Sequence, residues 1–356
     1  LETLPPGKIK QLQLRKFKEI FRWAYENSTF HWRLYDNAGL KPQDVQSFED
    51  IKRVPKVEKS MMRDIQGKEP FPYGDALCVP LEDVTIFRQT SGTTGQPVYQ
   101  PDTWQDWEWW TECWSYILWA QGYRPRDRVF IPFGYNIFVA FWAGHYAAEK
   151  IGCEVIPGGV LDTKARILKI QELQATAMMG TPTYILGMAE TAQSKMEINP
   201  SELTIDKITC AGECGASIPS TKRRLEKAWG AKVYGHAGAT EIGAWSFECD
   251  HQPGGLHVND AFFQGRIHLS ARQKHCGHTG GTVNVGDDTT RVTDFFTFEV
   301  LEGPNRHLGM DEVVIMLNGT QPVHVVSGVG FSGNFLAAQS RIPGIPLIRA
   351  VHSKGV

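Results

Sequence analysis

The sequence predicts an α/β fold in which mostly parallel strands are flanked by helices, followed by a β-rich C-terminal stretch. Between residues 84 and 234, short β-branched or apolar runs alternate with helical segments of ten or more residues. This alternation is typical of a parallel sheet that helices cover on both faces. From Gln264 to Gln339 helical periodicity fades, and short β-branched runs follow one another. We therefore predict a main domain over residues 1–263 and an atypical β-rich tail over residues 264–356.

The composition is that of a globular protein. The 356 residues suffice for a sizeable core, and 42% hydrophobic with 21% charged residues exclude disordered, collagen-like and coiled-coil chains. A net charge of -2 gives no electrostatic reason to expect nucleic acid or an anionic membrane as a partner. The longest apolar stretch, residues 129–144, is too short and interrupted to span ~30 Å of hydrocarbon. Seven cysteines without framework spacing favour a reducing compartment, so we expect a cytoplasmic protein.

The individual elements follow from the spacing of apolar residues. A first amphipathic helix is expected over residues 8–27, and the turn-rich residues 42–80 read as a lead-in rather than as core. Further helices are expected over residues 102–121, 139–151, 163–175, 184–193 and 220–229. Strands are expected at residues 84–87, 128–132, 154–157, 177–180, 207–211 and 232–234.

A glycine- and hydroxyl-rich loop after the first strand carries the strongest chemical signal. It reads Thr-Ser-Gly-Thr-Thr-Gly from Thr90 to Gly95. Its glycines allow backbone conformations in which successive N–H groups converge on phosphate oxygens, and its hydroxyl groups add further donors. The lysine of a Gly-x4-Gly-Lys-Ser/Thr loop is missing. A flexible surface loop of the same composition remains an alternative.

Several short motifs together resemble the adenylate-forming enzymes and, among them, the phenylacetate–CoA ligase family. Residues 90–97 are similar to the phosphate loop of those enzymes. Each motif is weak alone, but their joint occurrence in the family's order over residues 1–263 is specific. The other motifs are the opening Leu-x-x-Leu-Pro and residues 24–27, 133–135, 180–184, 211–213 and 237–241.

The resemblance implies an adenylate-forming N-terminal domain that activates an aryl or arylacetic acid, such as phenylacetate, in two steps. The carboxylate attacks the α-phosphate of ATP, which gives an acyl-adenylate and pyrophosphate, and the thiol of CoA then displaces AMP. The implied cofactors are ATP, Mg²⁺ and CoA, because preorganised donors and a metal ion stabilise the charge that develops on the phosphate oxygens. The residues implied to hold the β- and γ-phosphates are Ser91, Gly92, Thr93, Thr94 and Gly95.

The resemblance also implies roles for residues outside the loop. Glu241 would bind Mg²⁺ and Thr240 the α-phosphate, although a helix cap followed by an acid in the first turn explains the same pair. The residues implied to surround the nucleotide are Gly212, Glu213, Tyr234, Ala237, Gly238 and Ala239. Those implied to bind the acid are Phe133, Tyr135, Ile137 and Phe138; Phe141 and Trp142 are further candidates that suit the core equally well.

A second group of residues suggests structural zinc. Thiolates and imidazoles at short spacing can place three ligands tetrahedrally, and a distant residue can supply the fourth. A buried cysteine with surface histidines explains the same pattern, so both interpretations stay open. The four candidate ligands are Cys214, Cys249, His251 and His257.

The sequence departs from the family's pattern at several positions. Gln96 stands where Lys or Arg is usual, Gly235 where Asp is usual, and Ala237 where an aromatic residue is common. The family continues past a Pro-Leu-Ile-Arg stretch into a ribose-binding Asp and a mobile C-terminal domain. Here residues 346–349 match that stretch, and the chain ends at Val356. We therefore expect slow adenylation and an impaired CoA step.

Two other functions remain open on the same residues. An adenylyltransferase would pass AMP to a different acceptor, and a CoA-dependence assay separates it from a ligase. An inactive adenylate-forming fold would bind nucleotide or carboxylate without turnover. For all three we expect small-molecule partners, with no nucleic acid and no membrane, and a homodimer is left open.

Overall fold

The structure is a computed structural model that describes residues 5–92, 95–250, 255–259, 263–267, 301–303, 306–309, 313–317 and 322–325. Its side chains are described as far as Asn259, apart from those of Pro6, Cys214 and His257.

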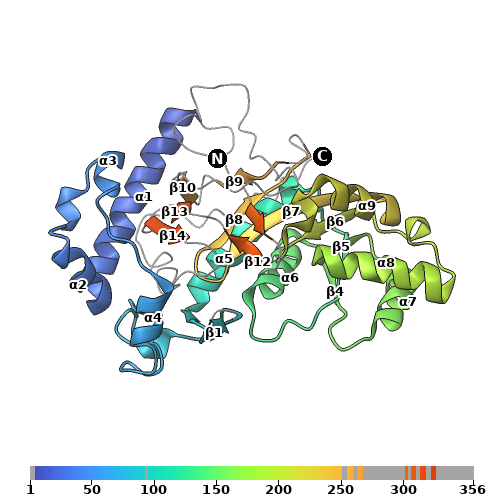
Figure 1. The fold of residues 1–356 in the computed structure, drawn as a ribbon, viewed down its shortest axis with the longest axis horizontal. Coiled ribbons are helices and arrows are strands. Elements are labelled where there is room, and N and C mark those ends of the chain that lie inside the picture. The colour runs from blue at the N-terminus through green and yellow to red at the C-terminus, as the bar shows by residue number, and fades with distance from the viewer. Residues whose placement is uncertain are drawn as a thin grey trace.

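A seven-stranded sheet forms the centre of the molecule (Figure 1). Its strand order is β4-β3-β5-β6-β7-β8-β9; the first five strands are parallel, and β8 and β9 add in antiparallel register. The expected mostly parallel α/β fold is therefore confirmed. The strands are β3 (Arg128–Ile131), β4 (Glu154–Pro157), β5 (Ala177–Gly180), β6 (Lys207–Cys210), β7 (Lys232–Ala239), β8 (Gly243–Phe247) and β9 (His257–Val258).

Helices cover both faces of this sheet because side chains alternate along each strand. Val129 and Ile131 pack into one buried cluster with residues of α5 and α6, whereas Phe130 packs into a second cluster with residues of α7, α8 and α9. The five helices are α5 (Trp104–Ala120), α6 (Val139–Ile151), α7 (Thr163–Leu173), α8 (Pro182–Met196) and α9 (Pro219–Trp229).

The tryptophan-rich helix α5 belongs to the core. A capping box starts it, in which the Thr103 side chain accepts from the backbone N–H of Asp106 and the Asp106 carboxylate accepts in return. Trp107, Trp110 and Trp114 are at most 2% exposed. These tryptophans therefore stabilise the fold by burial rather than lining a site.

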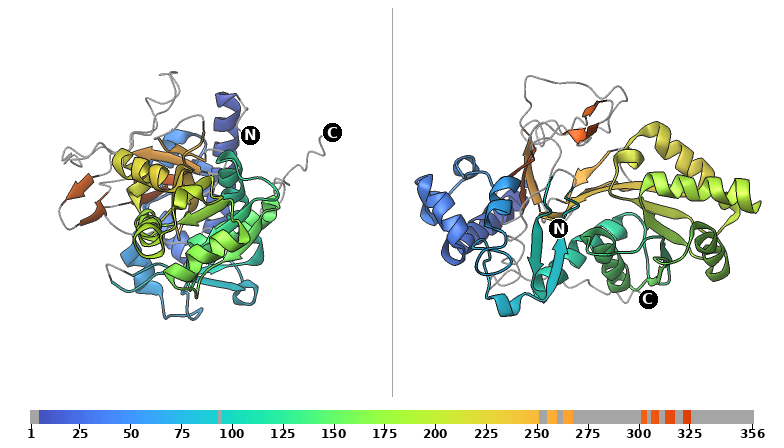
Figure 2. Two further views of the ribbon diagram at one scale, coloured as in Figure 1. Left: turned by 90° about the vertical axis from the view of Figure 1, so that its right-hand side faces the viewer. Right: turned by 60° about the horizontal axis from the view of Figure 1, so that its bottom comes forward.

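The N-terminal residues form a helical region at the opposite end of the molecule from α7–α9 (Figures 1 and 2). The interpretation of residues 42–80 as a mere lead-in is wrong. Val45, Ile51 and Val54 are buried in one cluster with Phe21 and Tyr35. The elements of this region are α1 (Pro6–Asn27), α2 (Thr29–Asn37), η1 (Pro42–Asp44), α3 (Phe48–Ile51), α4 (Lys59–Ile65) and η2 (Leu81–Asp83).

A two-stranded antiparallel hairpin of β1 (Ile86–Gln89) and β2 (Tyr99–Asp102) lies between the two ends. Described strands of the tail also pair in antiparallel fashion, and the division of the chain at residue 263 stays a prediction. None of the helices described is long and apolar enough to cross a membrane. The remaining elements are η3 (Pro200–Glu202), η4 (Cys214–Ser217), β10 (Phe263–Ile267), β11 (Leu301–Gly303), β12 (Arg306–Gly309), β13 (Val313–Leu317) and β14 (Pro322–Val325).

Candidate active site

The glycine- and hydroxyl-rich loop connects β1 to β2. Thr90 and Val98 close it: the Thr90 N–H donates to the Val98 carbonyl at 3.0 Å, and the Val98 N–H donates to the Thr90 hydroxyl at 2.9 Å. Gly92 adopts a φ of +69°, and a Cβ atom there would lie 2.9 Å from the Gly95 carbonyl oxygen. Only glycine meets both demands without strain. Ser91 is exposed, and Thr93 and Thr94 lie outside the described residues.

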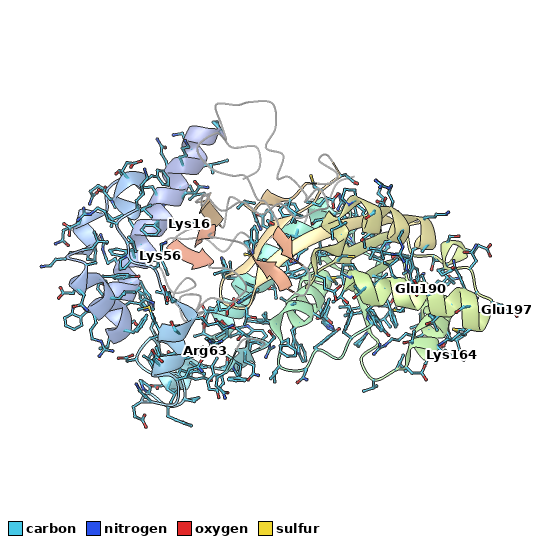
Figure 3. The ribbon with its side chains drawn as sticks, viewed as in Figure 1. Lys16, Lys56, Arg63, Lys164, Glu190 and Glu197 are labelled. Atoms are coloured by element: carbon cyan, nitrogen blue, oxygen red, sulfur yellow. The ribbon has the colours of Figure 1, made fainter. Side chains whose placement is uncertain are left out.

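Helix α4, which carries Arg63 (labelled in Figure 3), contacts this loop. The Arg63 Nε donates to the Gln96 carbonyl at 2.8 Å. One turn further, the Gln66 side chain donates to the Pro97 carbonyl at 3.0 Å and accepts from the Tyr99 N–H at 2.6 Å. The guanidinium of Arg63 therefore lies next to Gln96, the position at which this sequence lacks the Lys or Arg that is usual in the resembled family.

The same helix contacts the carboxylate that the sequence assigned to Mg²⁺. Glu241 lies in the turn between β7 and β8, and its side chain is 2% exposed. The Lys59 Nζ is 3.7 Å from the Glu241 Oε1. Burial lowers the pKa of Lys59, and the charge of Glu241 opposes that shift. Lys59 and Arg63 are four residues apart and therefore lie on one face of α4. One turn of this helix thus contacts Glu241 through Lys59 and the loop through Arg63.

The local structure excludes one of the two explanations of Thr240 and Glu241, and the functional role of the pair stays a prediction. The Ile242 N–H donates to the Ala239 carbonyl at 3.2 Å, which closes a turn between two antiparallel strands. No helix begins at this point of the described chain. The alternative of a helix cap with a first-turn acid is therefore wrong.

The residues assigned to the nucleotide base follow β6 or lie within β7. Gly212 follows β6 with a φ of +83°, and the carboxylate of the exposed Glu213 accepts from the Thr183 hydroxyl at 2.8 Å. Thr183 is in the first turn of α8, where an acidic partner is favourable. The Tyr234 hydroxyl donates to the Asp250 Oδ1 at 2.7 Å, and burial raises the pKa of Tyr234.

The last residues of β7 lead from Tyr234 to Thr240. A bulge lies between Ala237 and Gly238, where the pairing with β8 shifts register. A Cβ atom on Gly238 would lie 3.0 Å from the Gly243 carbonyl oxygen. Ala239 ends the strand and begins the turn that carries Glu241.

An aromatic cluster occupies the segment assigned to the acid, which follows β3. The Phe133 ring stacks on Phe141 with centroids 4.7 Å apart and lies 5.1 Å from the ring of Tyr184. A Cβ atom on Gly180 would lie only 2.8 Å from the Phe133 ring, so this glycine leaves the space that Phe133 fills. Phe133 therefore sits where the carboxyl ends of β3 and β5 meet, the edge at which α/β folds bind ligands.

The rest of that segment runs toward the glycine- and hydroxyl-rich loop. The Tyr135 hydroxyl is 2.8 Å from the His145 Nδ1, and burial raises the pKa of Tyr135. Ile137 and Phe138 are 37% and 43% exposed. The Gln89 N–H, at the start of the loop, donates to the Ile137 carbonyl at 3.3 Å. The structure thus brings the aromatic segment, the loop and, through α4, Glu241 together.

Of the candidate metal ligands, only Glu241 and Cys249 have side chains that the structure describes. Glu241 offers oxygen atoms, which suit Mg²⁺. Among the residues described, no three His, Cys, Asp or Glu side chains are grouped to hold a metal ion. Cys249 is buried and forms no disulfide. The other candidate zinc ligands, Cys214, His251 and His257, lie outside the described side chains, so the zinc site stays a prediction.

Sequence reasoning missed the cations of α4. Lys59, Arg63 and Gln66 lie in the stretch that was interpreted as a lead-in. Lys59 and Arg63 are four residues apart and lie on one face of α4, and Gln66 follows its end, but a helix of seven residues gives no periodic signal in the sequence.

Comparison with known proteins finds relatives among coenzyme A ligases. Phenylacetate-coenzyme A ligase from Thermus thermophilus is 30% identical over 267 residues, covering 74% of this chain and 58% of that protein. The enzyme of the same name from Escherichia coli is 31% identical over 198 residues, covering 55% of this chain and 44% of that protein. The chain therefore spans about half the length of these relatives. No protein-family profile matches it.

A solved structure shows the same fold. An open conformation of 2-hydroxyisobutyryl-CoA ligase, in complex with its acyl-AMP and CoA, superposes with a TM-score of 0.74 at 23% identity. The match covers 91% of this chain and 65% of that one. The chain is thus a relative of the phenylacetate–coenzyme A ligases and has the fold of the adenylate-forming coenzyme A ligases.

Proposed function

We propose that this chain forms the nucleotide- and acid-binding part of an AMP-forming ligase that activates an aryl or arylacetic acid such as phenylacetate. One observation carries the proposal. Lys59 and Arg63, on one turn of α4, contact Glu241 and the phosphate loop respectively. A triphosphate needs cations and N–H donors together with a carboxylate that can hold its metal ion, and this arrangement supports that need.

The residues divide the work of acyl-adenylate formation. The N–H groups of residues 91–95 and the guanidinium of Arg63 bind the β- and γ-phosphates, so Arg63 replaces the cation missing at Gln96. Thr240 donates to the α-phosphate. Glu241 would hold Mg²⁺, which would neutralise charge on the phosphate oxygens.

The acid binds beside the phosphate loop. Phe133 and Tyr135 present aromatic surface to a flat substrate, and Ile137 and Phe138 lie at the exposed end of the same segment. The contact between Gln89 and Ile137 supports a carboxylate positioned next to the loop, where it can attack the α-phosphate.

Two finer parts of the proposal concern CoA and zinc. Transfer of the acyl group to CoA is the second step, and the impairment of that step stays a prediction. A structural zinc held by Cys214, Cys249, His251 and His257 would fix the segment after β8. Metal analysis of the purified chain tests this zinc site. A zinc content below about one tenth of an atom per chain would exclude it.

The experiment is ATP–pyrophosphate exchange by the full chain with phenylacetate, with and without CoA. We expect exchange that requires the acid, and loss of that exchange in Glu241→Gln. The matched control is Glu112→Gln, which neutralises another buried glutamate paired with a lysine, Lys150, on α6. Acid-independent exchange, or equal exchange in Glu241→Gln and the parent chain, would contradict the proposal. Nucleotide binding without any exchange would favour a binding protein.

A further inference from the structure

An arginine lies among three aromatic rings at the base of the glycine- and hydroxyl-rich loop. Arg88 is on β1, two residues before Thr90. Its guanidinium carbon is 5.0 Å from the ring centre of Trp107, on α5, and 5.2 Å from that of Trp142, on α6. The Tyr146 ring lies between the two tryptophans in contact order, with centroids 5.7 Å from Trp107 and 6.4 Å from Trp142.

The rings hold the guanidinium in place. The Arg88 Nε is buried and has no hydrogen-bond partner among the residues that the structure describes, and Nη1 donates to the carbonyl of the adjacent Phe87 at 2.7 Å. A guanidinium within about 6 Å of an aromatic ring centre is attracted to the ring, more strongly where water is excluded. Trp107 is 2% exposed and belongs to the core, so Arg88 links Trp142 to a fixed part of the molecule.

Trp142 in turn fixes the segment assigned to the acid. Its Nε1 donates to the Asn136 carbonyl at 2.8 Å. Asn136 has a φ of +51°, and its side-chain oxygen accepts from the Ile137 N–H at 2.9 Å. The Ile137 carbonyl accepts from the N–H of Gln89, the residue after Arg88. The contacts therefore form a closed ring that leaves β1 at Arg88 and returns to it at Gln89.

This ring of contacts bears on the separation between the segment and the loop. Ile137 and Phe138 are 37% and 43% exposed, so burial alone does not fix the segment. The bond from Gln89 to Ile137 is 3.3 Å long, which is at the weak end for N–H···O bonds. A second link between β1 and the segment, through Arg88 and Trp142, therefore adds to the order of the segment.

We propose that Arg88 is a positioning residue that, through Trp142, sets the separation between the bound acid and the phosphate loop. The inference rests on the proposed function, in which the acid binds at residues 133–138 and the triphosphate at the loop. Attack of a carboxylate on the α-phosphate requires the reacting atoms at about 3–3.5 Å, and a misplacement of about 1 Å can cost about a hundredfold in rate.

The first test is ATP–pyrophosphate exchange by the full chain with phenylacetate. Arg88→Met removes the cation and keeps an unbranched side chain, so kcat should fall about tenfold while the KM for ATP changes less than about twofold. Arg88→Lys keeps a cation beside the rings and should recover at least about threefold of that loss. The matched control is Arg124→Met, which removes another arginine over a tryptophan, Trp119 at 4.1 Å, and should keep the parent kcat.

The second test asks whether the two side chains act along one path. Trp142→Phe keeps an aromatic ring beside Arg88 but removes the N–H that donates to Asn136, so it should also lower kcat. The double variant of Arg88→Met and Trp142→Phe should be within about twofold of the slower single variant, because both changes break the same ring of contacts. Losses that multiply would overturn the inference.

Hydrogen exchange tests the position of the segment without relying on activity. Backbone amides of residues 134–138 should exchange about tenfold faster in Arg88→Met, because local opening becomes easier, and at the parent rate in Arg124→Met. Unchanged amide exchange in Arg88→Met overturns the inference whatever the kinetics show.

The remaining outcomes are also decisive. A parent-like kcat in Arg88→Met overturns the inference and leaves the proposed function intact. Equal losses of kcat and of ATP affinity overturn it too, because they are the result of a purely structural role. If Arg88→Met does not fold, Trp142→Phe decides in its place, and a parent-like kcat in that variant overturns the inference. A parent chain without acid-dependent exchange overturns the proposed function, and the inference with it.

Discussion

Replacing Lys59 by methionine removes the cation that faces Glu241. The two side chains are 8% and 2% exposed, so solvent screens their attraction little. At an effective dielectric constant of about 20, unit charges 3.7 Å apart attract by about 4 kcal/mol. Removing one partner of a buried ion pair costs about 3–5 kcal/mol, because the remaining charge stays uncompensated. We therefore expect Lys59→Met to lower the free energy of unfolding by about 3 kcal/mol or more.

The assay is a double-mutant cycle with Glu241→Gln, followed by chemical unfolding. The double variant carries neither buried charge, so it should be more stable than Lys59→Met by about 2 kcal/mol or more. Restored stability should not restore nucleotide chemistry, because the double variant lacks the proposed Mg²⁺ ligand. The rate of acyl-adenylate formation in the double variant should therefore stay about tenfold or more below that of the parent chain.

The control uses a second lysine–glutamate pair, which lies away from the candidate site. Lys150→Met separates Lys150 from Glu112, whose side chains are 33% and 4% exposed, and should destabilise the chain without changing ATP affinity. Additive effects of Lys59→Met and Glu241→Gln would refute the reasoning, because they would mean that the two charges do not interact. An equal loss of ATP affinity in Lys150→Met would show that the assay follows stability alone.

Three further predictions concern pH, the phosphate loop and the acid. Burial raises the pKa of the Asp102 carboxyl to about 7, so the folded chain holds this proton more tightly than the unfolded chain does. The free energy of unfolding should therefore fall as pH rises from about 4 to about 7, and unfolding curves of Asp102→Asn should show less of this decline; identical pH profiles would count against it. Gly92→Ala and Gly39→Ala place a side chain at similar positive φ, of +69° and +63°. Gly39→Ala should cost about 1 kcal/mol of stability, and Gly92→Ala should cost more, because its Cβ atom would also lie 2.9 Å from the Gly95 carbonyl oxygen. Only Gly92→Ala should weaken ATP binding in calorimetry, by about tenfold, because nothing lies within 4 Å of a Cβ atom on Gly39. Phe133→Ala should raise the KM for phenylacetate by about tenfold and that for ATP by less than about twofold, and a shared increase would argue against an aromatic acid site at this residue.

The sheet and its helices could be predicted because their patterns are local. The helix at residues 139–151 and the strands at 154–157 and 177–180 have the bounds that apolar spacing indicated. β7 extends to Ala239, five residues past the expected end, because pairing with β8 supports a run of glycine and alanine that has little strand propensity of its own.

The site could be predicted only where a motif marked it. The glycines of the loop and the Thr240–Glu241 pair are recognisable in the sequence, whereas Lys59 is not. α4 is a seven-residue helix, too short for a periodic signal, and its partners lie more than 30 residues away. Tertiary packing determines such long-range contacts, and a single sequence without related sequences gives no information on them.

The two contacts of α4 have a consequence for local stability. Helix α4 of the N-terminal helical region contacts both the loop of residues 90–97 and Glu241 at the end of the central sheet, so a nucleotide bound at the proposed site would link the two parts. A nucleotide that binds only while α4 contacts both the loop and Glu241 should slow the local unfolding of α4. It should slow the local unfolding of α7–α9, at the far end of the molecule, less. Backbone amides of residues 59–65 would then exchange hydrogen more slowly when the nucleotide is added, while amides of the distant helices would exchange at an unchanged rate.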